Sequence, residues 1–115
     1  LLTLPVPGKD MASHLKENRD DPEGVDRLLE KLAHFAASLH ERGFWHAHLN
    51  CKHIFFSPPE TFSLIDLERS HIYRTVPKAK RERNLQQLFR SLEKLGLEEK
   101  TEKLEKYYRI YSFEA

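Results

Sequence analysis

The fold of this chain is decided by residues 43–56, GFWHAHLNCKHIFF, together with residues 64–67, LIDL. The first stretch opens on a glycine, continues as a polar loop rich in histidine, and ends in three large apolar residues. The second stretch is short and apolar, and it delivers one aspartate, Asp66. Glycine commonly ends helices, and short apolar runs separated by turn residues mark strands. The two stretches therefore predict a helix that stops at Gly43, a polar loop, and two short strands on either side of a turn.

Length and composition limit the classes of protein to which the chain can belong. At 115 residues it is long enough for a single domain, 1–115, with one core. The hydrophobic fraction of 39% and the charged fraction of 32% are typical of a globular rather than a disordered protein. A net charge of +1 argues against nucleic acid as a partner. The exception is the basic run at 78–83, KAKRER, which is either a solvated surface or a face for phosphate groups or anionic lipid.

The single cysteine, Cys51, excludes an internal disulfide and favours a reducing, cytoplasmic location. No apolar stretch approaches the ~20 residues that a membrane span requires, so we expect no transmembrane segment. Residues 1–5, LLTLP, have neither an initiating methionine nor a basic leader, and we expect no signal peptide there. We interpret this start as the middle of a longer protein or of a processed domain.

The clearest helix spans residues 22–42. Asp21 suits the N-cap, Pro22 the first helical position, and Gly43 the position just past the end. Apolar residues recur along it at three- and four-residue steps: Val25, Leu28, Leu29, Leu32, Phe35, Ala36 and Leu39. This spacing places them on one face, which predicts an amphipathic helix with that face in the core.

The rest of the chain predicts a hairpin and closing helices. Residues 54–56 and 62–65 are the hairpin strands, because the prolines between them cannot donate to a ladder and belong in the turn. Leucine and tyrosine steps predict two helices within 81–111, separated by Gly96. Residues 1–10 are interpreted as a hinge-like strand and connector. The expected fold class is mostly α with a small β-hairpin (α+β).

Several segments, taken in order, resemble one known family. They are 39–46 (LHERGFWH), 53–56 (HIFF), 64–69 (LIDLER), 74–77 (RTVP) and 83–92 (RNLQQLFRSL). They look like the lipopolysaccharide core kinases, the bacterial enzymes that phosphorylate Kdo or heptose sugars. The resemblance runs from the first strand to about Tyr108. It implies a protein-kinase-like carboxy-terminal lobe in which residues 43–67 form the catalytic-loop and metal-loop region.

The resemblance implies roles for four residues. His46 would anchor the catalytic loop and His48 occupies the position of the catalytic aspartate, so both are candidate catalytic residues. His53 lies where the kinase loop carries its asparagine, and would contact metal or phosphate. Asp66 is the hard oxygen ligand that Mg²⁺ requires. His53 and Asp66 are therefore the candidate cofactor-binding and metal-binding residues, for the ATP and Mg²⁺ that the complete family uses.

Three features argue against catalysis by this chain. An imidazole at His48 can act as a base near neutral pH, but it lacks the charge and the two oxygens of a carboxylate. Asn84 stands where the resemblance implies a buried aspartate that braces the loop, and an amide accepts hydrogen bonds more weakly. The sequence has no glycine-rich loop and no strand with a phosphate-pairing lysine, which both belong to the amino-terminal lobe. We therefore expect an inactive chain whose missing amino-terminal lobe, or another protein partner, is supplied elsewhere.

Two other hypotheses use the same residues. The first is a non-catalytic, pseudokinase-type domain that binds or scaffolds after loss of the reaction, which the imidazole at His48 favours. The second is a small zinc-binding module, whose potential ligands lie within eight residues: His46, His48, Cys51 and His53. Structural zinc sites usually join two distant pairs of ligands, which argues against so local a cluster.

The resemblance also implies a partner and a location. The complete family transfers a phosphoryl group from ATP to a sugar hydroxyl of lipopolysaccharide, so an anionic glycolipid is the expected partner. The basic run at 78–83 is a candidate docking face for it. We expect the chain to act in the cytoplasm, at the inner face of the bacterial inner membrane.

Overall fold

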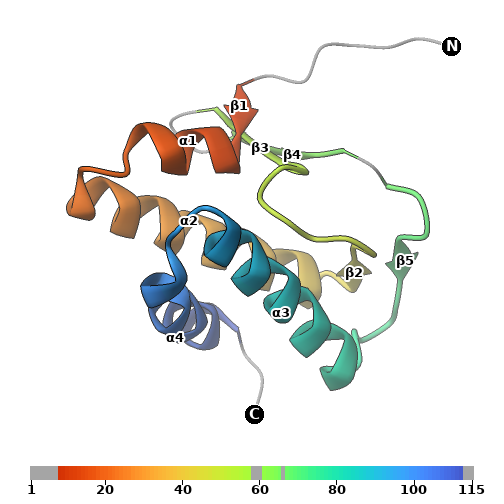
Figure 1. Ribbon diagram of the computed structural model, residues 1–115. Helices are drawn as coiled ribbons and strands as arrows, with labels where there is room; N and C mark the ends of the chain where they lie inside the picture. Colours follow the sequence, from red (N-terminus) through yellow and green to blue (C-terminus); the bar gives the residue numbers. More distant parts are fainter. Residues whose placement is uncertain (1–7, 58–60, 66, 113–115) are drawn as a thin grey trace, which may run out of the picture.

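The computed structural model describes residues 8–57, 61–65 and 67–112, in which the helices lie together beside two small antiparallel sheets (Figure 1). The first seven residues, with the expected hinge-like strand, lie outside the described residues. Three residues of the hairpin turn and Asp66 also lie outside them. The fold class is the expected one, mostly α with a small amount of β (α+β).

The longest helix, α2 (Pro22–Glu41), confirms the amphipathic helix predicted from the sequence. Pro22 occupies its first position, where the missing N–H costs no hydrogen bond, and Asp21 is the N-cap residue. Within the described chain, the Asp21 carboxylate makes no capping hydrogen bond. Gly43 lies just past the end with a φ of +84°, and a Cβ there would collide with the carbonyl oxygen of Tyr73. This corner therefore requires a glycine.

The other helical elements are α1 (Met11–Glu17), α3 (Lys78–Lys94), the short 3-10 helix η1 (Glu98–Lys100) and α4 (Thr101–Tyr111). α3 begins three residues before the predicted start at 81, so the basic run 78–83 forms its first turns. The earlier start was missed because helix prediction rests on apolar steps, and only Ala79 is apolar there. None of the helices in the described residues is long and apolar enough to cross a membrane.

The strands are β1 (Lys9–Asp10), β2 (Phe44–Trp45), β3 (Ile54–Ser57), β4 (Thr61–Leu64) and β5 (His71–Ile72). The larger sheet has the order β1–β3–β4 and contains the predicted hairpin, with Ile54 opposite Leu64. The smaller sheet pairs β2 with β5, so that Phe44 lies opposite Ile72. β1 and β5 were not predicted, because a strand of two residues carries no periodicity. Lys9 and Asp10 thus pair with β3 instead of serving only as a connector.

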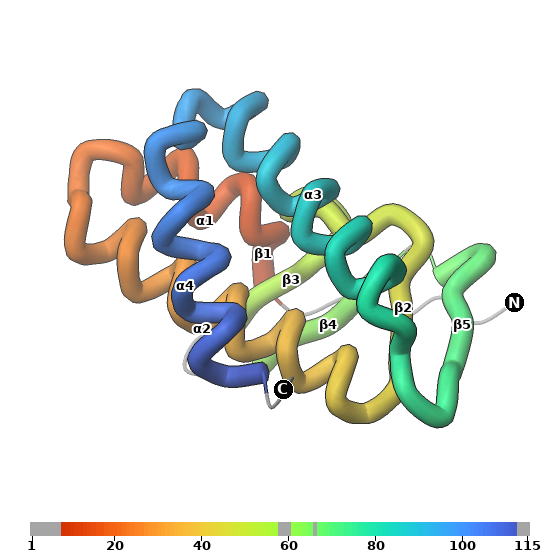
Figure 2. Tube along the Cα trace, turned by 90° about the horizontal axis from the view of Figure 1, so that it is seen from below, coloured from red at the N-terminus to blue at the C-terminus, as the bar shows by residue number. Residues whose placement is uncertain are grey.

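The main core lies between α2, α4, α3 and the larger sheet (Figures 1 and 2). α4 runs along α2, and the two helices bury Leu29 and Leu104 completely. Phe35 of α2 stacks on Phe62 of β4 with the ring centroids 4.4 Å apart. The long helix α2 therefore packs against both α4 and the larger sheet.

A second, smaller cluster surrounds Trp45, at the start of the histidine-rich loop. The indole Nε1 donates to the carbonyl oxygen of Lys80 at 3.1 Å, and the Lys80 ammonium lies 4.5 Å from the centroid of the indole ring. A cation over an indole face is attracted to it. Trp45 therefore fixes the first turn of α3 beside the loop.

Truncating the α4 contact should destabilise the fold. We expect Leu104→Ala to lower the free energy of unfolding by about 2–5 kcal/mol, because it leaves a cavity against α2. Ile110→Ala, on the same helix at a side chain that is 60% exposed, should change it by less than about 0.5 kcal/mol. Urea unfolding of the two variants gives both values, and equal losses would contradict the packing of α4 on α2.

Candidate functional site

The candidate site is built on residues 46–53, the loop between β2 and β3, which lies against α3 (Figures 1 and 2). Backbone hydrogen bonds hold its far end on two sides. The amide of Ala12 in α1 donates to the carbonyl oxygen of Cys51 at 3.2 Å, and the amide of Ile65 donates to that of His53 at 3.0 Å. The loop is thereby fixed between α1 and the end of the hairpin.

His46 is fully buried, and both of its ring nitrogens have partners. Nε2 lies 2.9 Å from the carbonyl oxygen of Ile65, and Nδ1 lies 3.0 Å from the amide nitrogen of His48. Because a carbonyl oxygen only accepts and an amide only donates, the ring is neutral and carries its proton on Nε2. This geometry suits anchoring of the loop rather than proton transfer.

A buried carboxamide, Asn84 of α3, connects the loop to α2 and α4. Its Nδ2 donates to the carbonyl oxygen of His46 at 2.7 Å and to Oε1 of Gln87 at 2.9 Å. Its Oδ1 accepts from Nε2 of His40 at 2.9 Å, and Nδ1 of His40 lies 2.8 Å from the hydroxyl of Tyr108. The sequence led us to expect that Asn84 accepts hydrogen bonds more weakly than an aspartate would. That expectation was incomplete, because Asn84 is the donor in the hydrogen bond to the loop. A carboxylate has no proton to donate there.

Two further polar side chains of α3 hold the loop backbone. Gln87 accepts from the amide of Leu49 at 3.0 Å and donates to the carbonyl oxygen of Ala47 at 2.8 Å. Ser91 Oγ accepts from the amide of Cys51 at 3.1 Å. Together with the carboxamide described above, these side chains follow one another at three- and four-residue steps and so share one helix face. This spacing of polar residues is visible in the sequence. The prediction of the helix used only the apolar residues and therefore missed the polar face.

His48, at the position implied for catalysis, is held only through its backbone. Its amide donates to His46, and its carbonyl oxygen accepts from Nδ1 of His53 at 2.7 Å. The imidazole is exposed, and it makes no hydrogen bond, ion pair or ring contact within the described part of the chain. A side chain that acts as a base is normally oriented by a partner. Among the described residues, none orients the ring of His48, and its catalytic position stays a prediction.

His53 lies beside His46, with the ring centroids 5.7 Å apart. It is the only one of the two implied magnesium ligands that the described residues include, since Asp66 lies outside them. Mg²⁺ prefers carboxylate, carbonyl and water oxygens, and an imidazole nitrogen is a softer ligand. The described residues of the loop therefore do not make a site that fits Mg²⁺ by themselves.

The zinc hypothesis requires the histidines of the loop and Cys51 to converge, and the structure does not bring them together. Both nitrogens of His46 are engaged, and Cys51 is buried against Ser91 of α3. Burial raises the pKa of the Cys51 thiol to about 12, whereas zinc binds the thiolate. Among the described residues, no group of three or more His, Cys, Asp or Glu side chains could hold a metal ion.

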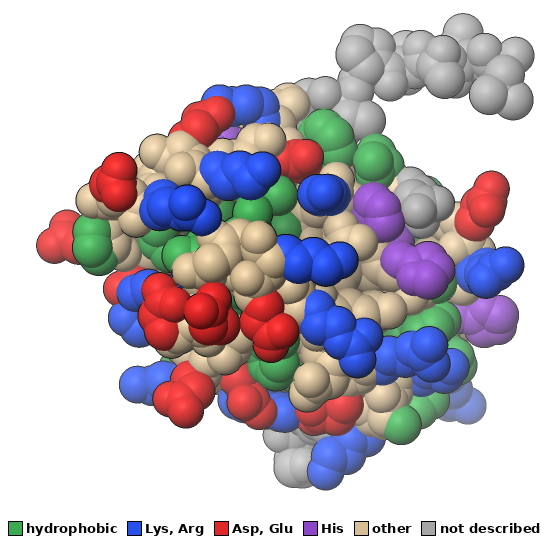
Figure 3. Space-filling view, viewed as in Figure 1, with side chains coloured by type: hydrophobic (Ala, Val, Ile, Leu, Met, Phe, Trp, Pro, Cys, Tyr) green, Lys and Arg blue, Asp and Glu red, His purple; other side chains and the backbone are tan. Residues whose placement is uncertain are grey.

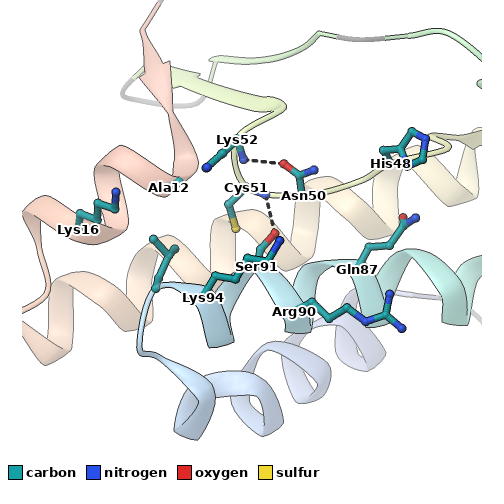
Figure 4. A pocket seen from close by; sticks show the side chains of 11 residues that line it. Ala12, Lys16, His48, Asn50, Cys51, Lys52, Gln87, Arg90, Ser91 and Lys94 are labelled. Atoms are coloured by element: carbon teal, nitrogen blue, oxygen red, sulfur yellow. Dashed lines mark hydrogen bonds between the residues drawn. The ribbon is translucent and has the colours of Figure 1, made fainter.

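A cavity of ≈380 Å³ opens beside the loop, between α1 and α3 (Figure 4). His48 lies at one end of it. Four cationic side chains line it: Lys16, Lys52, Arg90 and Lys94. No carboxylate is found among its described lining residues. The sequence analysis did not anticipate this cavity, and the basic run at 78–83 contributes nothing to its lining.

The buried histidine anchors the loop, a polar face of α3 holds it, and a small sheet lies beside it. This α+β arrangement is consistent with a protein-kinase-like fold. A model of the lipopolysaccharide kinase (Kdo/WaaP) family matches residues 6–108. The 3-deoxy-D-manno-octulosonic acid kinase of Stenotrophomonas maltophilia (strain K279a) is 39% identical over 125 aligned residues, which cover 91% of this chain and 50% of that protein. The chain belongs to the lipopolysaccharide kinase (Kdo/WaaP) family, which confirms the resemblance. It spans about half the length of the curated relative that it matches.

Removing the carboxamide of α3 should loosen the loop. We expect Asn84→Ala to cost about 2–4 kcal/mol of unfolding free energy, because buried groups of His40 and His46 lose their partner. Hydrogen exchange at the amides of His48 and Leu49 should accelerate in the same variant. Gln86→Ala, an exposed neighbour on α3, is the matched control and should leave both measurements unchanged. Unchanged exchange in Asn84→Ala would contradict the bracing role.

Cys51 should be unreactive while the protein is folded. With a thiol pKa of about 12, roughly one molecule in ten thousand carries the thiolate at pH 8, and the sulfur is also buried. We expect iodoacetamide to modify Cys51 at pH 8 only after denaturant is added, as peptide mass spectrometry would show. Rapid modification in buffer alone would mean that the loop opens away from α3.

Proposed function

We propose that this chain is the carboxy-terminal lobe of a lipopolysaccharide-kinase-like protein that binds an anionic glycolipid without phosphorylating it. One observation carries the proposal. The scaffold of the loop is complete, with His46 and Asn84 both in place, while the catalytic position holds an exposed imidazole. The groups that hold the loop are thus kept, while the group that would accept the proton of a sugar hydroxyl is not a carboxylate.

The chemistry of phosphoryl transfer explains why His48 matters. An acceptor sugar hydroxyl attacks the γ-phosphorus of ATP, the bond to ADP breaks, and the hydroxyl proton must be accepted. A carboxylate orients that hydroxyl and adds negative charge beside it. The His48 imidazole has neither the negative charge nor the two oxygens of a carboxylate, and no described residue fixes its orientation.

The cofactor side of the reaction supports the same proposal. The complete family implies ATP and Mg²⁺, with Asp66 as the oxygen ligand and His53 as a contact to metal or phosphate. When bound, the metal neutralises the charge that develops on the transferred phosphate. His53 would assist at the metal or at a phosphate, as the resemblance implies, so the departure from the reaction lies at His48.

The proposed place of action is the inner face of the bacterial inner membrane, where the glycolipid partner would be met. The first turns of α3 carry the basic run 78–83, and Arg83 and Lys78 are exposed there. Basic side chains next to an anionic membrane surface are attracted to it by about 1 kcal/mol each. An amino-terminal lobe, or another protein, would complete the assembly.

Restoring the carboxylate tests the proposal. In the full-length protein that contains this chain, we expect no transfer of the γ-phosphoryl group of ATP to a Kdo-containing lipopolysaccharide core. His48→Asp should raise the transfer about 10²-fold or more above that background, which is the contribution of a general base. Radiolabelled ATP and separation of the glycolipid product give the rate.

The control is His71→Asp, which makes the same change at an exposed histidine of β5. It should produce no gain. Transfer by the unaltered protein at a rate equal to that of His48→Asp would contradict the proposal and make His48 a working base.

A further inference from the structure

We propose that residues 67–83, which lead from the hairpin to the first turns of α3, bind the surface of an anionic lipid bilayer, with Leu67 and Ile72 inserted among the lipids. We call these residues the β5 corner, because β5 lies within them. The inference rests on the proposed function only for the place of action at a membrane. It goes beyond that function because it names an apolar contact, which the basic run 78–83 does not supply by itself.

Two large aliphatic side chains are exposed in the β5 corner. Leu67 is 53% exposed and Ile72 is 78% exposed. Among the described residues, the only other large hydrophobic side chain that is comparably exposed is Ile110, which lies on α4. A single exposed apolar residue is common on a protein surface, whereas two on one short segment indicate an interaction surface.

Backbone hydrogen bonds fix the segment that carries these side chains. The amide of Ser70 donates to the carbonyl oxygen of Leu67 at 3.1 Å and closes a turn in which Arg69 has a φ of +66°. A positive φ is uncommon for a residue other than glycine, and residues held in this way are often found at functional sites. Further on, the amide of Tyr73 donates to the carbonyl oxygen of Gly43 at 2.7 Å, beside the pairing of β5 with β2. The corner is therefore held on the small sheet, with its aliphatic side chains in exposed positions.

The β5 corner is also strongly basic. Six of its residues are Lys or Arg and two are Glu, in a chain whose net charge is +1. One of the two, Glu82, pairs with an arginine of α4 at 2.7 Å. Four of the cations are exposed and form no hydrogen bond or ion pair within the described part of the chain: Arg69, Arg74, Lys78 and Arg83. Figure 3 shows Lys and Arg side chains next to apolar ones at the lower right, over the start of α3. Basic side chains of this kind are attracted to an anionic lipid surface.

The combination of apolar and basic side chains fits a bilayer better than it fits nucleic acid. The phosphates of nucleic acid would attract the cations, but its bases are bound by aromatic rings that stack on them, not by exposed aliphatic chains. Segments that lie in a membrane interface place aliphatic side chains below the lipid headgroups and Lys or Arg side chains at their level. Stable anchoring commonly needs two such contributions, because one alone gives marginal binding. The β5 corner carries both.

The position of the corner relates it to the candidate site. β5 pairs with β2, with His71 opposite Trp45, and the loop 46–53 follows Trp45 directly (Figure 1). The Trp45 indole also donates to the carbonyl oxygen of Lys80 at 3.1 Å, so it contacts both ends of the corner. Binding at the corner would thus orient the domain, with the start of the loop toward the membrane.

The test is flotation of the full-length protein with lipid vesicles, without ATP or lipopolysaccharide. We expect retention by vesicles of phosphatidylglycerol mixed with phosphatidylcholine, and much weaker retention by phosphatidylcholine alone, because the cations then lack an anionic partner. Ile72→Ser should weaken binding to the mixed vesicles about tenfold or more, since a hydroxymethyl group replaces the inserted aliphatic chain. Leu67→Ser should act in the same direction.

Matched controls make the same changes elsewhere on the surface. Ile110→Ser, at the exposed side chain of α4, should alter binding less than about twofold. Arg74→Gln combined with Lys78→Gln should weaken binding about tenfold or more, because two cations no longer meet the anionic surface. Arg27→Gln combined with Lys106→Gln neutralises two exposed cations of α2 and α4, and should change binding less than about twofold.

Several results would overturn the proposal. Equal weakening by Ile72→Ser and Ile110→Ser would mean that binding follows the apolar surface as a whole. Full binding by Ile72→Ser, with loss in the Arg74 and Lys78 double variant, would leave adsorption by charge without insertion. Failure to bind either kind of vesicle would overturn it too, and binding of single-stranded DNA would then identify nucleic acid as the partner of the corner.

The outcome is separate from that of the proposed function. The vesicle measurements contain neither ATP nor a sugar acceptor, so they report on the membrane contact alone. Phosphoryl transfer by the unaltered protein to a detergent-solubilised lipopolysaccharide core would refute the non-catalytic function and leave the membrane contact standing. Unchanged flotation of Ile72→Ser would refute the membrane contact and leave the non-catalytic function standing.

Discussion

The structure depends on one carboxamide. Asn84 accepts from His40 of α2 and donates to the carbonyl oxygen of His46, so one buried side chain connects the long helix to the loop. Tyr108 extends the chain of hydrogen bonds to α4. Every member of this chain is buried, and a buried polar group without a partner is costly. Loss of one member therefore affects helices that are far apart in sequence.

Some of this architecture follows from local sequence patterns, and some cannot. The long helix was predicted because its apolar steps, its proline and Gly43 agree with one another. The hairpin was predicted because its apolar runs flank prolines. The strand Lys9–Asp10 gave no signal, since two residues have no period, and the contact of His40 with Tyr108 spans 68 residues. Contacts of that range are fixed by packing, which a single sequence does not display.

For the candidate site, too, some residues could be predicted from the sequence and others could not. The resemblance to a kinase catalytic loop implied roles for His46, His48 and His53, and hydrogen bonds join them within one loop, while those roles stay predictions. The cavity residues come from α1, the loop and α3, and nothing in the sequence links Lys16 to Arg90. The lining of this cavity thus comes from segments that meet only after folding, whereas the three histidines lie within one short loop.

The way in which His48 is held has a consequence for how such chains change over generations. The loop uses only the backbone amide and carbonyl of this residue, and its side chain is exposed at one end of the cavity. Substitution there leaves the packing and the hydrogen bonds of the fold untouched. Selection for a stable protein is therefore blind to the side chain at position 48. It is not blind to His46 and Asn84, whose side chains make the buried hydrogen bonds that hold the loop.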